Sequence, residues 1–467
     1  MKCPGWLARG AFRGAVAGLL AWWGLADAQS GERVKLTLEE GIHLALEKDE
    51  TLLIAQTDLQ KSRQQLRRVR ADIFPQFSAS MSYGRNWLLP TSIFGAAGRQ
   101  QEVTVGREHS LNGVLSMRQP LLGSGWGAQV KSARLFVGYA TEVERQARQE
   151  LTGEVEKRFY GLLLAQELVG ISGQTLDRVT ANLERTQSLR RAGRVSDYEV
   201  LRTQVQLAAL QSDSIRVRNE LSLAAIALRD AVRLEGDLEA QGEFLEESRL
   251  DLASLDNLLE LGRARRPEMR QVERQLGMQE YALRLKQGQG RPVVDLFASG
   301  QMAFQSSRLD LYREEAWGRS WVSGLSVVLP LEGIRAGAEL DQARLDVERA
   351  QLEKALVERE IRLEIHQAWT GAQDAGKRVA AQRRVIEGAE RNLWFAESRY
   401  FSGVGTQLEV LDAQLTLMEA QTGYAIARHD QTLALVELER AVGVLGEPVE
   451  GALKRAAGAP GKPVDAK

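Results

Sequence analysis

The chain has 467 residues, of which 44% are hydrophobic and 26% are charged, and its net charge at pH 7 is −1. This composition is too apolar for a disordered protein and too charged for a membrane protein built from many helices. The balanced charge also argues against nucleic-acid binding, because proteins of that class carry a basic surface or stretch.

Residues 1–28 are predicted to form a signal peptide. Basic residues precede a short apolar run, and Ala26-Asp27-Ala28 then supplies a cleavage site of the small–x–small type. The run is too short to span a bilayer comfortably, so an uncleaved anchor is the less favoured alternative. The only cysteine, Cys3, lies within this segment. The mature chain is therefore expected to form no disulfide and no cysteine-ligated metal site.

The mature chain is expected to have no transmembrane helix, because no run approaches the roughly 18 apolar residues that such a helix needs. The signal peptide nevertheless predicts export. An exported chain without helical spans can enter a membrane only with β-strands, because lipid does not satisfy unpaired backbone groups.

The rest of the chain carries one pattern twice. The segment TLEEGIHLALEKDETL matches the later segment SLDNLLELGRARRPEM, and each is followed at the same distance by a proline, Pro75 or Pro292. Matched prolines argue against chance similarity, because helix composition does not place them. We predict repeats at about 37–236 and 254–446. The Pro-, Gly- and Ala-rich tail at 447–467 is expected to be disordered.

A pair of β-strands is predicted in each repeat, at about 76–119 and 292–330. Apolar and polar residues alternate there, as in QFSASMSYG and VVDLFASGQMAF. Segments of about ten alternating residues are typical of transmembrane strands. Alternation alone leaves an ordinary half-buried sheet open as an alternative, but export without helical spans favours the membrane interpretation.

Long helices are predicted to follow each strand pair. No proline lies between Pro120 and Pro267, or between Pro330 and Pro448, and proline is excluded from helix interiors. Apolar residues recur in these stretches every seven positions, which indicates a left-handed supercoiled seam. A helix from about 128 to 190 would be roughly 95 Å long, so it must project as a rod or line a tube.

Each long helix is predicted to end in a tight turn that leads into a second helix. The two turns read RRAGRVSDYEVL and YFSGVGTQLEVL. Ser196 with Glu199, and Thr406 with Glu409, have the spacing of capping boxes, in which each side chain accepts from the other residue's N–H. Each repeat therefore contains a long helical hairpin with a narrow tip.

The predicted strands imply an oligomer. Four strands per chain are too few to close a barrel, since about eight is the smallest number that packs well. Open strand edges in lipid would leave backbone groups unsatisfied. Several copies are therefore expected to share one barrel, with the helical hairpins lined up beneath it as a second tube.

Together these segments resemble the outer membrane efflux protein family, the TolC-like channels, over about residues 36–446. The resemblance is carried by TLEEGIHLALEKDETL, by the passages QPLLGSGWGAQVKSA and VLPLEGIRAGAELDQA, by both tips and by LEVLDAQ. It implies a mainly α fold with membrane β, in which each of two tandem repeats is a β-strand pair plus long coiled-coil helical hairpins. The strands would form a shared trimeric β-barrel, continued by a periplasmic α-barrel. Residues 29–446 would be the channel.

The resemblance implies the outer membrane channel component of a tripartite efflux or type I secretion system. Such a channel is a passive homotrimeric conduit in the outer membrane that extends into the periplasm, with no enzymatic activity and no cofactor. Its implied partners are outer membrane lipid, a periplasmic adaptor (membrane fusion) protein and an inner-membrane pump of RND, ABC or MFS type. The cargo and the pump class stay open. The competing hypothesis is a periplasmic adaptor or coiled-coil scaffold, although an adaptor would show one hairpin rather than two.

The resemblance also assigns docking residues at the tips. Small residues at a tight turn leave room for a partner's helical tip, so the adaptor is expected to dock there; the less favoured alternative is that these residues are only turn formers. The candidates are Gly193, Arg194, Val195, Ser196, Gly403, Val404, Gly405 and Thr406.

Glu409 and Asp412, in the string LEVLD, match the acidic aperture of the family. They lie three apart on one helical face, and a trimer would present three copies of each around a narrow opening. Such a ring repels itself, binds cations and favours opening when it is uncompensated. Arg202 occupies the position of Asp412 in the first repeat, so the repeats differ there. A solvated helix face with a cap residue is the alternative.

No catalytic site and no metal site are predicted. Glu40 and His43 have the spacing of a carboxylate–histidine metal motif, but a second copy of the motif is missing. The string GSGWG, from Gly123, lacks the Lys-Ser/Thr that follows in a phosphate-binding loop. We predict that it is a strand-to-helix turn.

Overall fold

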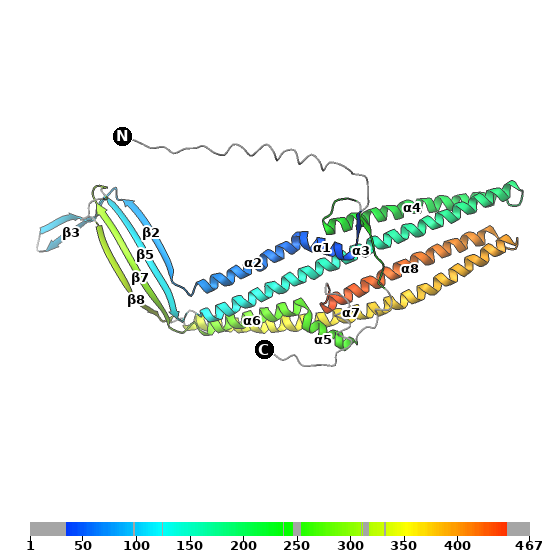
Figure 1. The fold of residues 1–467 in the computed structure, drawn as a ribbon. Coiled ribbons are helices and arrows are strands. Elements are labelled where there is room, and N and C mark those ends of the chain that lie inside the picture. The colour runs from blue at the N-terminus through cyan, green and yellow to red at the C-terminus, as the bar shows by residue number, and fades with distance from the viewer. Residues whose placement is uncertain are drawn as a thin grey trace, which may run out of the picture.

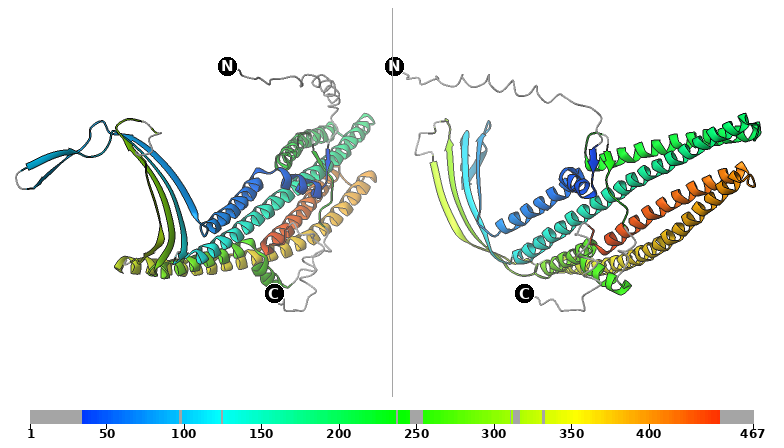
Figure 2. Two further views of the ribbon diagram at one scale, coloured as in Figure 1. Left: turned by 60° about the vertical axis from the view of Figure 1, so that its left-hand side comes forward. Right: turned by 45° about the vertical axis from the view of Figure 1, so that its right-hand side comes forward.

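The computed structural model describes residues 34–445, apart from 97–98, 124, 237, 246–253, 310, 312–316 and 331–332. The predicted signal peptide and the predicted tail lie outside the described residues. A layer of strands stands at one end of an elongated molecule, and long helices run away from it (Figure 1). Two turned views show that the sheet is curved and that both helical hairpins end at the far end of the molecule (Figure 2).

Four antiparallel strands form the main sheet, in the order β2-β5-β7-β8. The first repeat supplies β2 (Gln76–Arg85) and β5 (His109–Leu122), and the second supplies β7 (Val293–Ser306) and β8 (Trp317–Val328). The ladder between β5 and β7 joins the two repeats. Within the described part of the chain, β2 and β8 each have one edge without a strand partner.

The first strand region contains a hairpin that the alternation pattern does not reveal. Where the sequence predicts a loop between two strands, β3 (Thr91–Ala96) and β4 (Arg99–Thr104) pair as a separate antiparallel ribbon. The range 76–119 therefore holds four strands rather than two, which corrects the prediction. Both added strands have only six residues, too few for a clear alternation.

The pairing register gives the main sheet two chemically different faces. Paired residues on neighbouring strands share a face, as do residues two apart along one strand. The apolar face carries Phe77, Met81, Leu111, Leu115, Met117, Leu296, Met302, Phe304, Trp321 and Leu325. The polar face carries Ser78, Ser80, Ser82, Asn112, Ser116, Arg118, Asp295, Ser299, Gln301 and Ser326. An apolar outer face and a polar inner face are what strands of a membrane barrel require.

The long helices lie side by side in one layer. Next to the sheet the order is α2 (Glu50–Ala71), α3 (Trp126–Arg191), α6 (Pro267–Gln287) and α7 (Gly333–Phe401). Farther from the sheet, α4 (Asp197–Val232) takes the place of α2, and α8 (Gln407–Val442) takes the place of α6. The predicted helix at 128–190 is confirmed as α3, which has 66 residues.

Among the described residues, no helix combines the length and the apolar character that crossing a membrane would need.

The predicted heptad seams are buried at the middle of the helices and only half-buried toward the tips, at Leu176 and Leu183 of α3 and at Ile386 and Leu393 of α7. Val155 and Leu162 of α3 are fully enclosed, and Ile365, Ala372 and Val379 hold the matching positions of α7. The helix α3 pairs with α4 in one hairpin, and α7 pairs with α8 in the other. The predicted fold of two tandem repeats with long helical hairpins is thus confirmed.

A smaller band of elements lies at the middle of the helices. The strands β1 (Val34–Leu36) and β6 (Leu238–Ala240) pair in parallel, α1 (Leu38–Lys48) packs on α3 and α4, and α5 (Leu255–Arg265) packs on α7 and α8. At the start of α1, Glu40 accepts from the Thr37 N–H (3.0 Å), which completes a capping box. Glu40 therefore serves as a helix cap. Within the described part of the chain, no group of three or more His, Cys, Asp or Glu side chains is arranged so that it could hold a metal ion.

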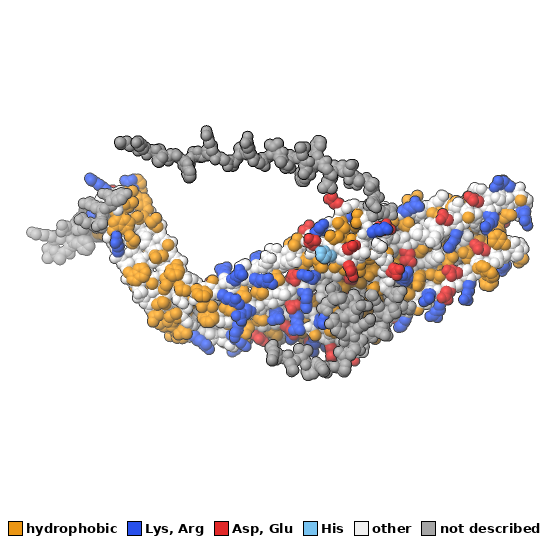
Figure 3. All heavy atoms as spheres, in the orientation of Figure 1, with side chains coloured by type: hydrophobic (Ala, Val, Ile, Leu, Met, Phe, Trp, Pro, Cys, Tyr) orange, Lys and Arg blue, Asp and Glu red, His pale blue; other side chains and the backbone are white. Residues whose placement is uncertain are grey.

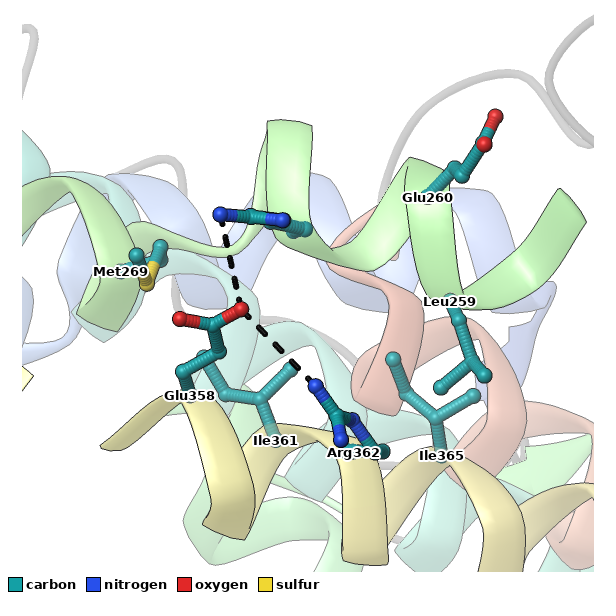
Figure 4. Close-up of a pocket in the computed structure, with 8 residues that line it drawn as sticks. Leu259, Glu260, Met269, Glu358, Ile361, Arg362 and Ile365 are labelled. Carbon is teal, nitrogen blue, oxygen red and sulfur yellow. Dashed lines mark ion pairs between the residues drawn. The ribbon is translucent and has the colours of Figure 1, made fainter. Parts of the chain in front are cut away.

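A cavity of about 350 Å³ opens between α5 and α7 at this band (Figure 4). Apolar side chains from both helices line it. At its rim, Glu358 pairs with Arg263 (3.5 Å) and Arg362 (3.9 Å). None of the predicted site residues lines this cavity.

The helix layer has two edges that carry exposed apolar side chains. One edge is formed by α2 and α4, and the other by α7. Exposed residues at heptad-like spacing suit packing against a further helix. On α4 they are Tyr198, Leu201, Val205 and Ile215, and on α7 they are Leu345, Leu352, Leu363, Trp394 and Phe395.

Candidate aperture and docking tips

The first predicted turn joins α3 to α4 at the end far from the sheet. Gly193 is left-handed, with φ 68°, and the N–H groups of Gly193 and Arg194 donate to the carbonyls of Arg190 (2.8 Å) and Leu189 (2.9 Å). An ion pair between Arg190 and Asp197 bridges the turn. A Cβ at position 193 would meet no atom within 4 Å, so only the backbone angle favours glycine there.

The second turn, from α7 to α8, is tighter. Gly403 has φ 76°, and the N–H groups of Val404 and Gly405 both donate to the Arg399 carbonyl, at 3.0 and 2.9 Å. A Cβ on Gly405 would lie 2.9 Å from the Cβ of Arg399. The backbone therefore leaves no room for a side chain at this position, whereas Val195 occupies the matching place in the first turn.

All eight predicted docking residues lie in these two turns, where the structure brings them to one end of the molecule. Six of them are exposed, and Val195 and Gly405 are half-buried. Val404 presents the most exposed apolar side chain of the set, at 72%. Their role in docking stays a prediction.

The helix caps at the tips form only in part, which corrects the expected capping boxes. Ser196 accepts from the Glu199 N–H (3.4 Å), and Thr406 accepts from the Glu409 N–H (3.3 Å). Neither glutamate side chain returns a bond to the cap residue. At the second tip, the Glu409 carboxylate instead pairs with Arg399 (3.6 Å), which draws it away from the cap.

The two predicted aperture residues differ in their surroundings. Glu409 is half-buried and partly neutralised by Arg399. Asp412 is exposed and belongs to no ion pair of the described residues. Asp412 therefore carries the less compensated charge at this end of α8.

Polar side chains fill the contact between the two hairpins near their tips. Asn182 of α3 and Gln407 and Gln414 of α8 are almost fully buried, and a cavity of about 180 Å³ adjoins Asn182 and Gln414. Burial raises the pKa of the Tyr400 phenol at this contact, and the nearby Glu199 carboxylate adds to the rise. Asn182 Nδ2, Gln407 Oε1 and Gln414 Oε1 are buried here without a hydrogen-bond partner among the described residues. Separating the hairpins would let water satisfy these atoms, so the hairpins part more easily here than at the apolar middle.

Sequence reasoning missed this polar layer. Gln407, Gln414 and Gln421 recur every seventh residue, and that spacing was the available signal. A search for apolar repeats passes over such a stripe, because nothing in the sequence shows that α3 packs against it.

Gly405→Ala is expected to loosen the second tip. The added Cβ would overpack the turn against Arg399, and overpacking costs about 1–3 kcal/mol. Hydrogen exchange of the backbone amides at 399–409 should then become faster. Gly388→Ala is the matched control on α7, because its Cβ would meet no atom within 4 Å and alanine favours a helix over glycine. Similar exchange in both variants would contradict a steric role for Gly405.

Comparisons with known proteins agree with this architecture. The family model described as outer membrane efflux protein matches residues 41–232 and 258–444. The chain is 23% identical over 423 residues to the alkaline protease secretion protein AprF of Pseudomonas aeruginosa, covering 88% of this chain and 85% of AprF. It is 25% identical over 404 residues to the solvent efflux pump outer membrane protein SrpC of Pseudomonas putida, covering 85% and 83%. A crystal structure of CusC superposes with a TM-score of 0.72 at 20% identity, covering 88% of this chain and 93% of that one.

Proposed function

The chain belongs to the outer membrane efflux protein family, and we propose that three copies form the outer membrane channel of a tripartite efflux or type I secretion system. The channel is a passive conduit that leads substrates from an inner-membrane pump across the periplasm and the outer membrane. It carries out no catalysis. Its partners on this view are a periplasmic adaptor and a pump of RND, ABC or MFS type.

The observation that carries this proposal is the set of open edges. The main sheet ends at β2 and β8 without closing, and the helix layer ends at α2 and α4 on one side and α7 on the other. In lipid an open sheet edge leaves backbone groups unsatisfied. Three copies would supply twelve strands, four from each, enough for a barrel whose polar faces turn inward. The same closure would cover the exposed apolar stripes of α4 and α7.

We propose the following division of the chain. Residues 1–28 direct export, residues 29–446 form the channel in two repeats, and residues 447–467 are a tail outside the channel. The eight residues of the two turns dock the adaptor, because they form the end farthest from the sheet and, apart from Arg194, their side chains are small enough to admit a partner closely. Glu409 and Asp412 line the aperture beside them.

The function is tested by determining the location of the protein in cells and its oligomeric state. We expect it in purified outer membranes, as trimers that resist SDS until they are heated, with channel conductance in planar bilayers. The competing scaffold hypothesis predicts a water-soluble periplasmic protein with no conductance. Recovery of a stable soluble monomer would overturn the channel assignment.

Asp412→Ala is expected to weaken block of the channel by divalent cations more than Glu409→Ala. Asp412 has no cationic partner among the described residues, whereas Arg399 already offsets part of the Glu409 charge. Losing one ring of three charges should raise the blocking concentration about tenfold, which corresponds to roughly 1.4 kcal/mol. Conductance in planar bilayers measures it, and Glu390→Ala, an exposed acid elsewhere on α7, is the control. Unchanged block would remove Asp412 from the aperture.

A further inference from the structure

The junction between sheet and helices carries exposed apolar side chains. Phe74, just before β2, is 66% exposed, Leu122 at the end of β5 is 65% exposed, and Trp126 at the start of α3 is 42% exposed. Aromatic and apolar side chains at the end of a membrane sheet mark the level where hydrocarbon gives way to headgroups. The adjoining turns of α2 and α3 then lie at headgroup depth. This step rests on the proposed placement of the sheet in the membrane.

Basic side chains gather on these adjoining turns. From Lys61 to Ala71, α2 has five Lys or Arg and no Asp or Glu. From Trp126 to Thr141, α3 has two Lys or Arg and again no acid. Figure 3 shows Lys and Arg side chains concentrated over this end of α2 and α3, whereas both signs are mixed farther along the helices.

Four of these side chains, Arg67, Arg70, Lys131 and Arg134, are here called the basic collar. Arg70 lies four residues before Phe74, and Lys131 lies five residues after Trp126, which places both about 6–8 Å below the junction. Arg67 and Arg134 lie about one turn lower. Long basic side chains extend toward a membrane surface, so all four come within range of the headgroup zone.

The basic collar lies on the outer face of the helix layer. Arg134 is three heptads before Val155, which packs beneath α1, so both lie on the face that carries α1. Only the outside of a closed tube has room for such an added helix. Lys131 lies 5.8 Å from the Tyr281 ring of α6 on this face.

The opposite face is marked by a groove of about 910 Å³ between α2, α3 and α6. Gln65 and Val69 of α2 and Phe136 of α3 line it, and no residue of the basic collar does. Because successive helix residues are 100° apart, Arg67 and Arg70 point away from that groove.

No member of the basic collar forms an ion pair within the described chain, although exposed arginines elsewhere do. Arg148 pairs with Glu144, Arg216 with Glu220, and Arg349 with Glu353, each one helical turn apart. The sequence supplies no acid at the equivalent positions beside the basic collar. Its charge therefore has no ion-pair partner among the described residues.

We propose that the basic collar binds the phosphates of anionic phospholipids in the periplasm-facing leaflet of the membrane. The phosphate oxygens would accept hydrogen bonds from the guanidinium and ammonium groups, which lack carboxylate partners of their own. Each Lys or Arg near an anionic membrane surface strengthens binding about fivefold, so four acting together give a strong preference over zwitterionic lipid.

The test is lipid binding to the purified full-length channel in detergent, counted by native mass spectrometry. Wild type is expected to bind phosphatidylglycerol at least about tenfold more tightly than phosphatidylethanolamine, with the preference reduced in 0.5 M salt. The combined variant Arg67→Gln, Arg70→Gln, Lys131→Gln and Arg134→Gln should lose that preference. The matched control removes four exposed arginines of α7 that lie away from the sheet, Arg359, Arg383, Arg384 and Arg391, and should keep it.

Equal binding of the two lipids to wild type would overturn the proposal, as would an unchanged preference in the collar variant or an equal loss in the control. The collar could instead pair with acids of a neighbouring copy. In that case trimers of the collar variant would dissociate even in the absence of lipid, and the trimers that remained would keep the preference for phosphatidylglycerol. That result would also overturn the proposal. Conductance of the wild-type protein in bilayers of phosphatidylethanolamine tests the channel function separately from lipid binding by the collar. A conducting wild type supports the channel function whatever the result of the lipid-binding experiment.

Discussion

Replacing Arg266 by alanine is expected to lower the free energy of unfolding by about 3 kcal/mol. The side chain is nearly fully buried where α6, α7 and α8 meet. It donates to Glu268 (2.9 and 3.1 Å), to Glu364 (2.6 Å) and to the Ala441 carbonyl (3.1 Å). Truncation would leave these acceptors without their donor. Both carboxylates are partly exposed, so water recovers some of the loss, and the effect falls at the lower end of the range for broken buried pairs.

Arg263→Ala provides the matched control, because Arg263 lies one turn earlier on α5 and is 67% exposed. It makes one ion pair, with Glu358 at 3.5 Å, and exposed pairs contribute less than about 1 kcal/mol. Unfolding of the detergent-solubilised protein, followed by circular dichroism at one protein concentration, measures both variants. Equal losses would show that the Arg266 network does not hold the three helices together.

The Arg266 network also predicts a pH dependence. Burial alone would raise the pKa of Glu268, but the hydrogen bonds and charge of Arg266 outweigh it and leave that pKa below its ordinary value. A carboxyl with a lowered folded pKa stabilises the protein above its unfolded pKa, and this contribution disappears as the pH falls through the folded pKa. Arg266→Ala should therefore lose less stability on acidification than wild type does.

The helical part of the fold could be predicted because its signals are local and repeated. Proline-free stretches and a seven-residue apolar period gave the extent of α3 and the burial of Val155, Leu162 and Ile365. The alternation in QFSASMSYG likewise gave β2, since one polar and one apolar face require it. The short β3–β4 hairpin has no such period, and the pattern does not detect it.

The parts that could not be predicted depend on residues far apart in the chain. Arg266 stands just before Pro267, where α6 begins, but it is buried only because Glu364 and Ala441 arrive from other helices. At the tips, the positions of both turns were predicted correctly. It did not show that Arg399 would take the Glu409 carboxylate away from the cap.

Glu156→Gln is expected to remove a loss of stability that wild type suffers as the pH rises. Glu156 lies on α3, where burial raises the pKa of its carboxyl from 4.5 to about 8, and repulsion from Glu439 of α8 adds to the rise. Between these two pH values the unfolded chain releases a proton that the folded chain keeps. The unfolded state then binds fewer protons, so the free energy of unfolding falls as the pH increases.

The expected fall is about 3 kcal/mol between pH 5 and pH 8.5, because each unit of pKa shift corresponds to about 1.4 kcal/mol and residual solvent contact reduces the full effect. A glutamine has the shape of the protonated carboxyl and no proton to lose, so Glu156→Gln should show a much smaller fall. Glu154→Gln, two residues earlier and exposed beside Arg158, should keep the slope of wild type. Denaturant unfolding at the two pH values measures all three proteins. If Glu156→Gln falls as steeply as wild type, then Glu156 is already ionised in the folded protein, and the contact between α3 and α8 tolerates two negative charges.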